Sequence, residues 1–250
     1  KNSNQNKLLS IKANLLINWF SEMKPSPVPD SIAVTNLRVL EKDSSLAFKQ
    51  THMLKGNPMV SPILVHDLDE NGFSDIIVLG SNKVLFNTGD EFRTNQLHPK
   101  LPPILNTAVI ADFTGDTLVD LIAVDAKSNK LILLEGKQNE TRFAEPIDCW
   151  SKHLELPSVI TAGDVDGDGD LDLFIGQYKQ PYLEGQMPTP YYDANDGHPA
   201  YLLQNSGNGK FIDITESSGL VKKRFRRTYG ASLVDLNSDD KLDLVVSSDF

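Results

Sequence analysis

The amino-acid sequence predicts an all-β protein in which one structural unit is repeated. Three observations predict it: an acidic nine-residue segment occurs four times, a short apolar run follows each copy at once, and Gly, Asn, Asp and Ser separate the runs. Short apolar runs bounded by turn-forming residues are typical of strands, and a spaced repeat is typical of stacked sheets. The acidic segments occupy residues 67–75, 112–120, 164–172 and 235–243.

Composition and charge exclude several classes of protein. The 250 residues are 40% hydrophobic and 23% charged, which is typical of a folded domain. No apolar run approaches the roughly 20 residues of a membrane span. A net charge of −10 argues against nucleic acid as a partner. The single cysteine, Cys149, cannot form a disulfide framework or a thiolate zinc site.

The first 24 residues carry apolar side chains at helical spacing, at Leu8, Ile11, Leu15 and Trp19. This spacing predicts an amphipathic helix over residues 1–24, which either packs on this protein or ends an upstream helical domain. Residues 25–30 hold prolines at alternate positions. They predict a Pro-rich linker, because proline cannot continue a helix.

After the linker, over residues 31–250, the sequence predicts mostly β structure. Residues 31–57 are expected to be lead-in strands, and Asn-Thr-Gly and Asn-Ser-Gly sequences later in the chain predict hairpins within the repeats. Each unit therefore reads as four antiparallel strands, the architecture of a β-propeller blade. The predicted blades span 60–100, 104–148, 157–220 with an insertion at 178–200, and 228–250.

The fourth unit holds only two predicted strands. One interpretation, which the sequence favours, is that the chain is part of a longer propeller. The other is that the runs 32–40 and 46–54 supply the two missing strands and close a small ring.

The acidic segments have the composition of a cation-binding loop. Side-chain oxygens at positions one, three, five and nine, with a backbone carbonyl at position seven, converge on one point. Oxygen-only ligation of this density suits Ca²⁺, and three or four ions are expected. The predicted ligands are Asp67, Asp69, Asn71, Phe73 and Asp75; Asp112, Thr114, Asp116, Leu118 and Asp120; Asp164, Asp166, Asp168, Asp170 and Asp172; and Asp235, Asn237, Asp239, Lys241 and Asp243.

Position twelve argues against an EF-hand, which places a glutamate there. The four residues at this position are apolar and lie in strand-like runs, so the ninth-position aspartate must close each site. The loop at 112–120 has Thr114 at position three and Thr117 in place of a turn glycine. It is either a calcium site or a structural turn.

This pattern resembles the FG-GAP/VCBS repeat of integrin α-subunit propellers, and Tyr229-Gly230-Ala231 resembles the small-residue entry to that motif. Residues 191–197, 201–203, 211–215 and 219–220 are similar to proteins of the cartilage acidic protein (ASPIC/UnbV-associated) group. The resemblance covers about residues 60–250. It implies a secreted protein, extracellular or periplasmic, that is a non-catalytic, calcium-stabilised propeller.

The insertion is the predicted partner-binding surface, for a protein or a glycan, because exposed aromatic and rigid residues suit recognition. Its candidate residues are Tyr182, Tyr191, Tyr192, Asp193, Asn195 and Asp196; the alternative is a cover loop between blades. A second hypothesis is an enzyme acting on polysaccharide, with Glu184, Asp193 or Asp196 as acid and base. The basic run 222–227 is either a solvated loop or a grip for an anionic partner.

Overall fold

A computed structural model of the chain describes residues 7–19, 29–43, 61–138, 142–180 and 193–249. The chain divides into two compact units, residues 1–53 and 54–250. Each unit is described by itself. No helix among the described residues has the length and hydropathy to cross a membrane.

The first unit contains a two-stranded antiparallel sheet of β1 (Lys7–Trp19) and β2 (Pro29–Asp43). The helix predicted over 1–24 is therefore wrong for residues 7–19. The helix prediction failed because apolar periodicity alone does not distinguish a helix from a strand in a short apolar run. Residues 29–43 are rich in β-branched side chains and supply a ladder partner, so Ile17 pairs with Ile32 and Leu15 with Val34.

The linker prediction is also wrong at its end, because Pro29 and Asp30 begin β2. Residues 25–28 lie outside the described residues. Of the lead-in strands predicted at 31–57, residues 31–43 belong to β2 and pair with β1. Residues 44–57, including the whole run 46–54, lie outside the described part of the chain.

The described residues of the second unit form three four-stranded antiparallel sheets and one two-stranded sheet, each with its strands in chain order. This bears out the predicted all-β class, and the sheets are consistent with propeller blades. The first sheet is β3 (Ile63–His66), β4 (Asp75–Val78), β5 (Lys83–Asn87) and β6 (Phe92–Gln96), with the short 3-10 helix η1 (Leu79–Ser81) between β4 and β5. The second is β7 (Ile104–Ala111), β8 (Asp120–Asp125), β9 (Lys130–Leu134) and β10 (Ile147–His153), and β10 runs past the predicted blade end at 148.

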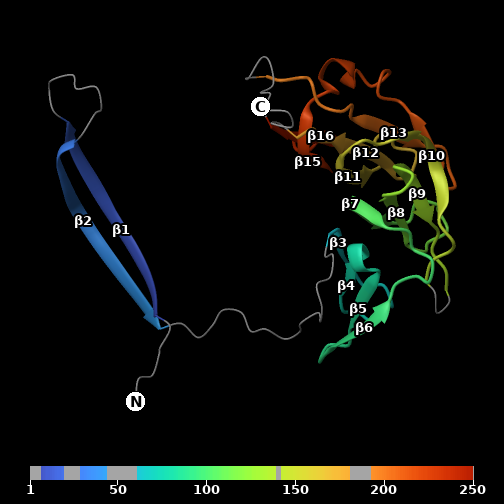
Figure 1. Ribbon diagram of the computed structural model, residues 1–250, viewed down its shortest axis with the longest axis horizontal. Helices are drawn as coiled ribbons and strands as arrows, with labels where there is room; N and C mark the ends of the chain where they lie inside the picture. The colour runs from blue at the N-terminus through green and yellow to red at the C-terminus, as the bar shows by residue number, and fades with distance from the viewer. Residues whose placement is uncertain (1–6, 20–28, 44–60, 139–141, 181–192, 250) are drawn as a thin grey trace. The chain divides into compact units, whose positions relative to one another are not determined.

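The third sheet is β11 (Pro157–Gly163), β12 (Asp172–Gln177), β13 (Tyr201–Asn205) and β14 (Phe211–Asp213). The 3-10 helix η3 (Leu220–Lys223) follows it. The fourth sheet is β15 (Arg227–Val234) and β16 (Asp243–Asp249). The first strands of successive sheets lie next to one another, β3 by β7, β7 by β11, and β11 by β15 (Figure 1).

The hydrophobic core lies between the faces of neighbouring sheets. In β8, Ile122 and Val124 pack toward the third sheet, whereas Leu121 and Ala123 pack toward the first. This alternation follows from the two-residue period of a strand, and it explains why the run after the closing aspartate is apolar on both faces of the sheet. A smaller cluster around Phe174 and Leu202 joins the third sheet to the fourth.

Candidate metal centres

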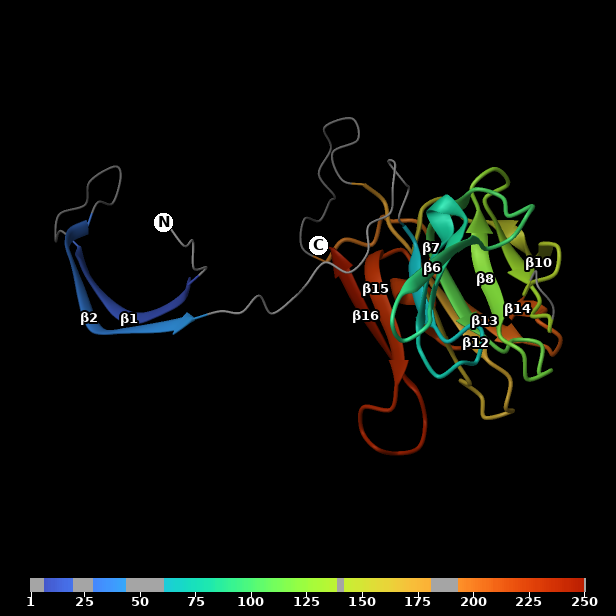
Figure 2. The ribbon, with the colours of Figure 1, turned by 90° about the horizontal axis from the view of Figure 1, so that it is seen from below.

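Each acidic segment forms the loop between the first and second strands of its sheet. The loop after β15 projects beyond the ends of β15 and β16 (Figure 2). Because all four loops have the same place in their sheets, the sequence repeat is a repeat of structure.

The first aspartate of each loop binds the loop's own backbone. Oδ1 of Asp164 accepts the N–H of Gly167 at 2.7 Å, and Oδ2 accepts the N–H of Gly169 at 3.0 Å. Both glycines have positive φ angles, 79° and 95°, which glycine adopts without steric cost. The same bonding holds the other loops, with Asp67 accepting from Asn71 and Gly72, Asp112 from Gly115, Asp116 and Thr117, and Asp235 from Ser238, Asp239 and Asp240.

The position-five side chain of each loop also bonds locally. Oδ1 of Asp168 accepts the N–H of Asp170 at 2.9 Å, and Oδ1 of Asn71 accepts the N–H of Phe73 at 2.8 Å. Asn71 also donates through Nδ2 to the carbonyl of Asn87 at 2.9 Å. Asp116 and Asp239 accept from Leu118 and Lys241 in the same way.

The ninth-position aspartate joins the loop to the rest of its sheet. Asp75, Asp120 and Asp172 are each 0% exposed. In each, Oδ2 accepts the N–H of the loop's second residue, and Oδ1 accepts an N–H at the end of the third strand or just after it. The two donors are Leu68 and Asn87 for Asp75, Phe113 and Gly136 for Asp120, and Val165 and Asn205 for Asp172.

The bond from the ninth-position aspartate to the third strand is not predicted by the sequence analysis, which expects only hairpins at Asn87 and Asn205. The two asparagines end the third strand in two different copies of the repeat. Their recurrence at the same place is the feature of the sequence that could have indicated this bond.

Two loops bring three carboxylates together. One oxygen from each of Asp67, Asp69 and Asp75 lies within 4.8 Å of the others, and the same holds for Asp164, Asp166 and Asp172. These are the predicted residues at positions one, three and nine. The position-five residues Asn71 and Asp168 are not in the triads, and the position-seven carbonyls stay predicted ligands.

An orphaned oxygen occupies position three of the first loop. Oδ1 of Asp69 is buried, and it has no hydrogen-bond partner among the described residues. A buried polar oxygen without a partner is costly, and a bound cation would supply one. The residues of the first loop thus fit a hard cation. In the loop 112–120 the Thr114 side chain interacts with Asp120, so the calcium-site interpretation of that loop stays a prediction.

Burial raises the pKa of two closing aspartates, Asp172 and Asp120. Desolvation is the main cause for Asp172, and the negative charges of Asp166 and Asp168 add to it, while backbone N–H groups oppose the increase in pKa. Desolvation likewise raises the pKa of Asp120. A divalent cation between these oxygens would favour their ionised form.

The predicted partner-binding residues fall in two groups. Tyr182, Tyr191 and Tyr192 lie outside the described residues, as does Glu184. Asp193 forms an ion pair with Arg226, and Asn195 donates to the carbonyl of Lys222 at 3.1 Å. Asp196 accepts two bonds from Arg227, from Nε at 3.0 Å and from Nη2 at 2.9 Å.

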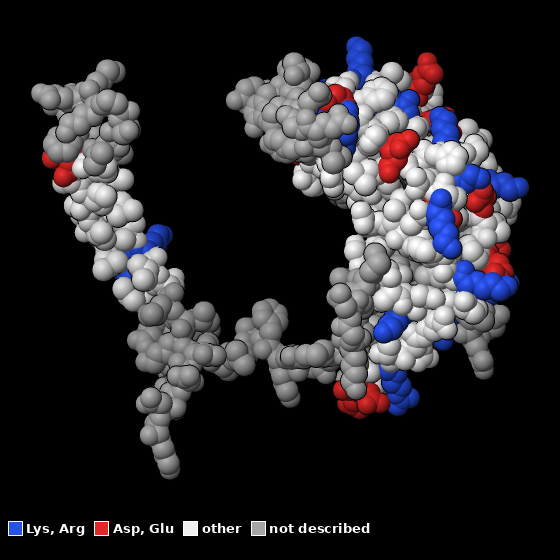
Figure 3. All heavy atoms as spheres, viewed as in Figure 1, with Lys and Arg blue, Asp and Glu red and all other residues white. Residues whose placement is uncertain are grey.

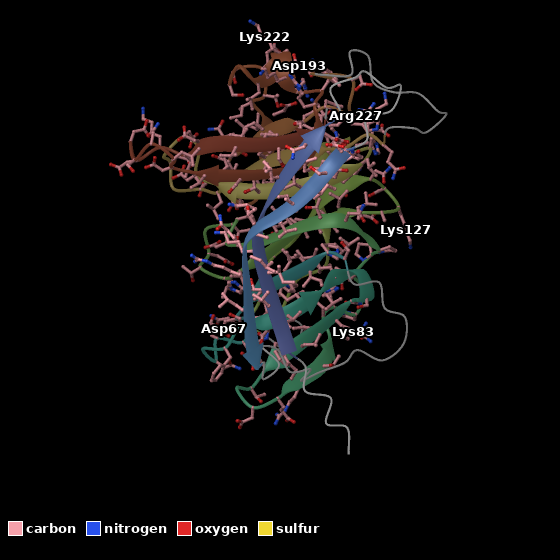
Figure 4. The ribbon with its side chains drawn as sticks, turned by 90° about the vertical axis from the view of Figure 1, so that its left-hand side faces the viewer. Asp67, Lys83, Lys127, Asp193, Lys222 and Arg227 are labelled. Carbon is pink, nitrogen blue, oxygen red and sulfur yellow. The ribbon has the colours of Figure 1, made fainter. Side chains whose placement is uncertain are left out.

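These contacts bind the end of the insertion to the basic run 222–227, and Figure 4 shows Asp193, Lys222 and Arg227 at the same end of the unit. Hydrogen bonds from the two arginines lower the pKa of Asp193 and of Asp196. A general acid needs a raised pKa, so this arrangement disfavours either residue as the proton donor of a polysaccharide-cleaving enzyme.

Comparison with known proteins agrees with the repeat seen in the sequence and the fold. Residues 112–175 match the FG-GAP-like repeat family. A stretch of 51 residues is 41% identical to cartilage acidic protein 1 of Xenopus tropicalis, covering 20% of this chain and 8% of that protein. The predicted resemblance is therefore confirmed: the chain carries an FG-GAP-like repeat and is similar over a short stretch to a cartilage acidic protein.

Proposed function

We propose that this chain is part of a calcium-stabilised β-propeller that acts as an extracellular or periplasmic binding module for a protein or glycan partner. The observation that carries the calcium proposal is the pair of aspartate triads, each in a loop whose backbone is held by its own first aspartate. The FG-GAP-like repeat supports the propeller and the binding role.

Calcium is the ion that suits these loops best. The ligand set offers carboxylate, amide, hydroxyl and carbonyl oxygens, without the sulfur or nitrogen ligands that favour zinc or copper. Position nine belongs both to the ligand set and to the sheet, so an ion bound there stabilises the folded chain. Binding at a hundredfold excess over Kd adds about 2.7 kcal/mol per site to the free energy of unfolding.

Calcium also supports the proposed location. Extracellular calcium is near millimolar and would fill sites of modest affinity, whereas the cytosolic concentration would not. On the face shown in Figure 3, acidic and basic side chains are interspersed on the second unit. Such a surface suits a protein or a neutral glycan better than a polyanion.

Thermal unfolding with millimolar calcium, millimolar magnesium or EDTA tests the proposal. We expect calcium to raise the unfolding midpoint by several degrees over EDTA and magnesium to raise it much less. Calorimetric titration of the apo chain should then count three or four ions. An unchanged midpoint would refute the structural role of calcium. Binding and turnover assays on a glycan panel separate a binding module from an enzyme.

A further inference from the structure

The third sheet holds the second residue of the acidic loop 112–120. The backbone carbonyl of Phe113 accepts a hydrogen bond from Nδ2 of Asn205 at 2.9 Å. The ring of Phe113 lies edge-on to that of Phe211, with 6.3 Å between the ring centroids, and Phe211 is the ladder partner of Asn205. Phe113 and Asn205 are each 1% exposed. The second loop is therefore fixed to the third sheet at one buried residue.

Asn205 also holds the acidic loop of its own sheet. Its backbone N–H donates to Oδ1 of Asp172, the closing aspartate of the third loop, at 2.8 Å. The N–H of Phe113 in turn donates to Oδ2 of Asp120, the closing aspartate of the second loop, at 2.8 Å. A chain of hydrogen bonds through Asn205 thus joins the closing aspartates of two successive loops.

The first and second sheets are joined at the same place by a different donor. The carbonyl of Leu68, the second residue of the first loop, accepts a hydrogen bond from Nη1 of Arg142 at 3.1 Å. Gly136 stands at the position of Asn205 in the second sheet, because its N–H donates to the closing aspartate there. Glycine has no side chain to reach the neighbouring loop. In the described part of the chain Arg142 does not bond to a closing aspartate, so this joint takes another route.

Asp172 is the residue of this chain of bonds that responds to a cation in the third loop, since it belongs to the triad of that loop. A divalent cation favours the ionised form of a carboxylate. A backbone N–H binds an ionised carboxylate more strongly than a neutral acceptor. The bond from Asn205 to Asp172 is thereby strengthened, and the end of β13 is held where the Asn205 side chain reaches Phe113.

We propose that Asn205 is a positioning residue that couples the third loop to the second, so that calcium bound at 164–172 also orders the loop 112–120. Because coupling between two sites is reciprocal, order in the loop 112–120 raises the calcium affinity of the third loop by the same factor. The inference rests on the proposed calcium site in the third loop. It does not require the loop 112–120 to bind an ion of its own.

Amide hydrogen exchange on the full chain, in millimolar calcium and in EDTA, measures the coupling. In the wild-type chain we expect calcium to slow exchange at residues 112–120 at least about fivefold, the lower end of a typical coupling between two sites. Asp166→Asn removes a charge from the triad of the third loop at an exposed side chain. We expect this variant to lose most of the slowing at 112–120, although the second loop itself is unchanged.

Asn205→Ala tests the route of the coupling. The variant keeps the triad and the backbone N–H that Asp172 accepts, but it removes the donor to Phe113. We expect calcium still to slow exchange at 164–172 and no longer at 112–120. Each variant is compared with itself in calcium and in EDTA, so a general loss of stability does not imitate this result.

The matched control is Asn87→Ala. Asn87 has the same place in the first sheet, where its N–H donates to Asp75 at 2.8 Å and its Nδ2 donates to the carbonyl of Ser74 at 3.2 Å. The variant removes an equivalent side chain without touching the bond between Asn205 and Phe113. We expect it to keep the full slowing at 112–120.

The outcomes separate this inference from the calcium proposal. Unchanged slowing at 112–120 in Asp166→Asn would overturn the coupling, because the second loop would then respond to an ion of its own. Slowing that is lost in Asp166→Asn but kept in Asn205→Ala would overturn the role of Asn205. If calcium slows exchange at 164–172 alone in the wild type, the coupling fails and the calcium proposal stands. If calcium slows exchange at neither loop, the calcium proposal itself fails.

Discussion

Oδ1 of Asp172 accepts the backbone N–H of Asn205 at 2.8 Å, across 33 residues of sequence. Oδ2 of the same carboxylate accepts the N–H of Val165 at 2.9 Å. One buried side chain therefore closes the acidic loop and holds the third strand of the sheet. One oxygen of the same carboxylate belongs to the candidate cation site, so the site and the sheet share this side chain.

Asp172→Asn should destabilise the chain even without calcium. The amide replaces one acceptor with a donor, so one of the two backbone N–H groups loses its partner. We expect a loss of about 2 kcal/mol in the free energy of unfolding, measured by urea denaturation in EDTA. Asp243→Asn is the matched control and should cost much less, because the amide oxygen can still accept the N–H of Leu236, the one such bond that Asp243 accepts among the described residues. Equal losses would contradict this role of Asp172.

The position-three carboxylate of the third loop should control the response to calcium. Asp166→Asn removes a charge from the triad, and we expect it to abolish most of the calcium-induced stabilisation of that site, up to about 2.7 kcal/mol. Asp170→Asn is the control in the same loop, since Asp170 is predicted to contribute only its backbone carbonyl. Titrations of both variants measure the effect. A larger loss in Asp170→Asn would show that the ligand set is wrong.

The ion pair of Asp196 and Arg227 should make part of the stability dependent on pH. Arg227 is 3% exposed, and its hydrogen bonds lower the pKa of Asp196. A carboxyl group with a lowered folded-state pKa stabilises the protein above its unfolded-state pKa. That contribution is lost as the pH falls through the folded-state value.

Asp196→Asn should therefore cost about 1 to 2 kcal/mol near pH 6, and the difference from wild type should vanish near pH 2. Urea denaturation over this pH range measures it. Asp90→Asn, in an exposed turn, is the control and should have no effect at either pH. A difference that persists at low pH would show that packing, and not charge, is responsible.

Cys149 should be unreactive in the folded chain. Its side chain is buried, and desolvation raises the pKa of the thiol to about 12, so almost no thiolate is present at pH 8. We expect a thiol-specific reagent to label the chain only as it unfolds, with a midpoint that follows the thermal transition in calcium and in EDTA. Rapid labelling well below that transition would mean that the faces of the second and third sheets separate locally.

The sequence was sufficient where the repeat constrains the local backbone. The acidic loops, the strands that follow them and the hairpins at 87–89 and 205–207 were all predictable, because turn residues and strand period act over a few neighbouring positions. The candidate ligand positions one, three and nine followed from the same spacing, and the structure brings their carboxylates together in two loops.

The sequence misled at the N-terminus for a related reason. Over residues 7–19 the apolar pattern is compatible with the period of a helix and with that of a strand. The strand forms because residues 29–43 pair with this segment. The pairing of Asp196 with Arg227 was likewise not predictable, because it depends on how two separate segments come together in space. The burial of Asp69 Oδ1 was not predictable either, because it depends on the residues that the folded sheet places around that atom.

The sequence by itself determined the all-β class, the repeated unit and the composition of the acidic loops, because these depend on residue type at short spacing. Only the tertiary structure decided that the ninth aspartate anchors a third strand and that residues 7–19 pair with residues 29–43 in an antiparallel sheet. These features depend on which distant strands come to lie side by side, and that is set by burial of apolar surface between sheets.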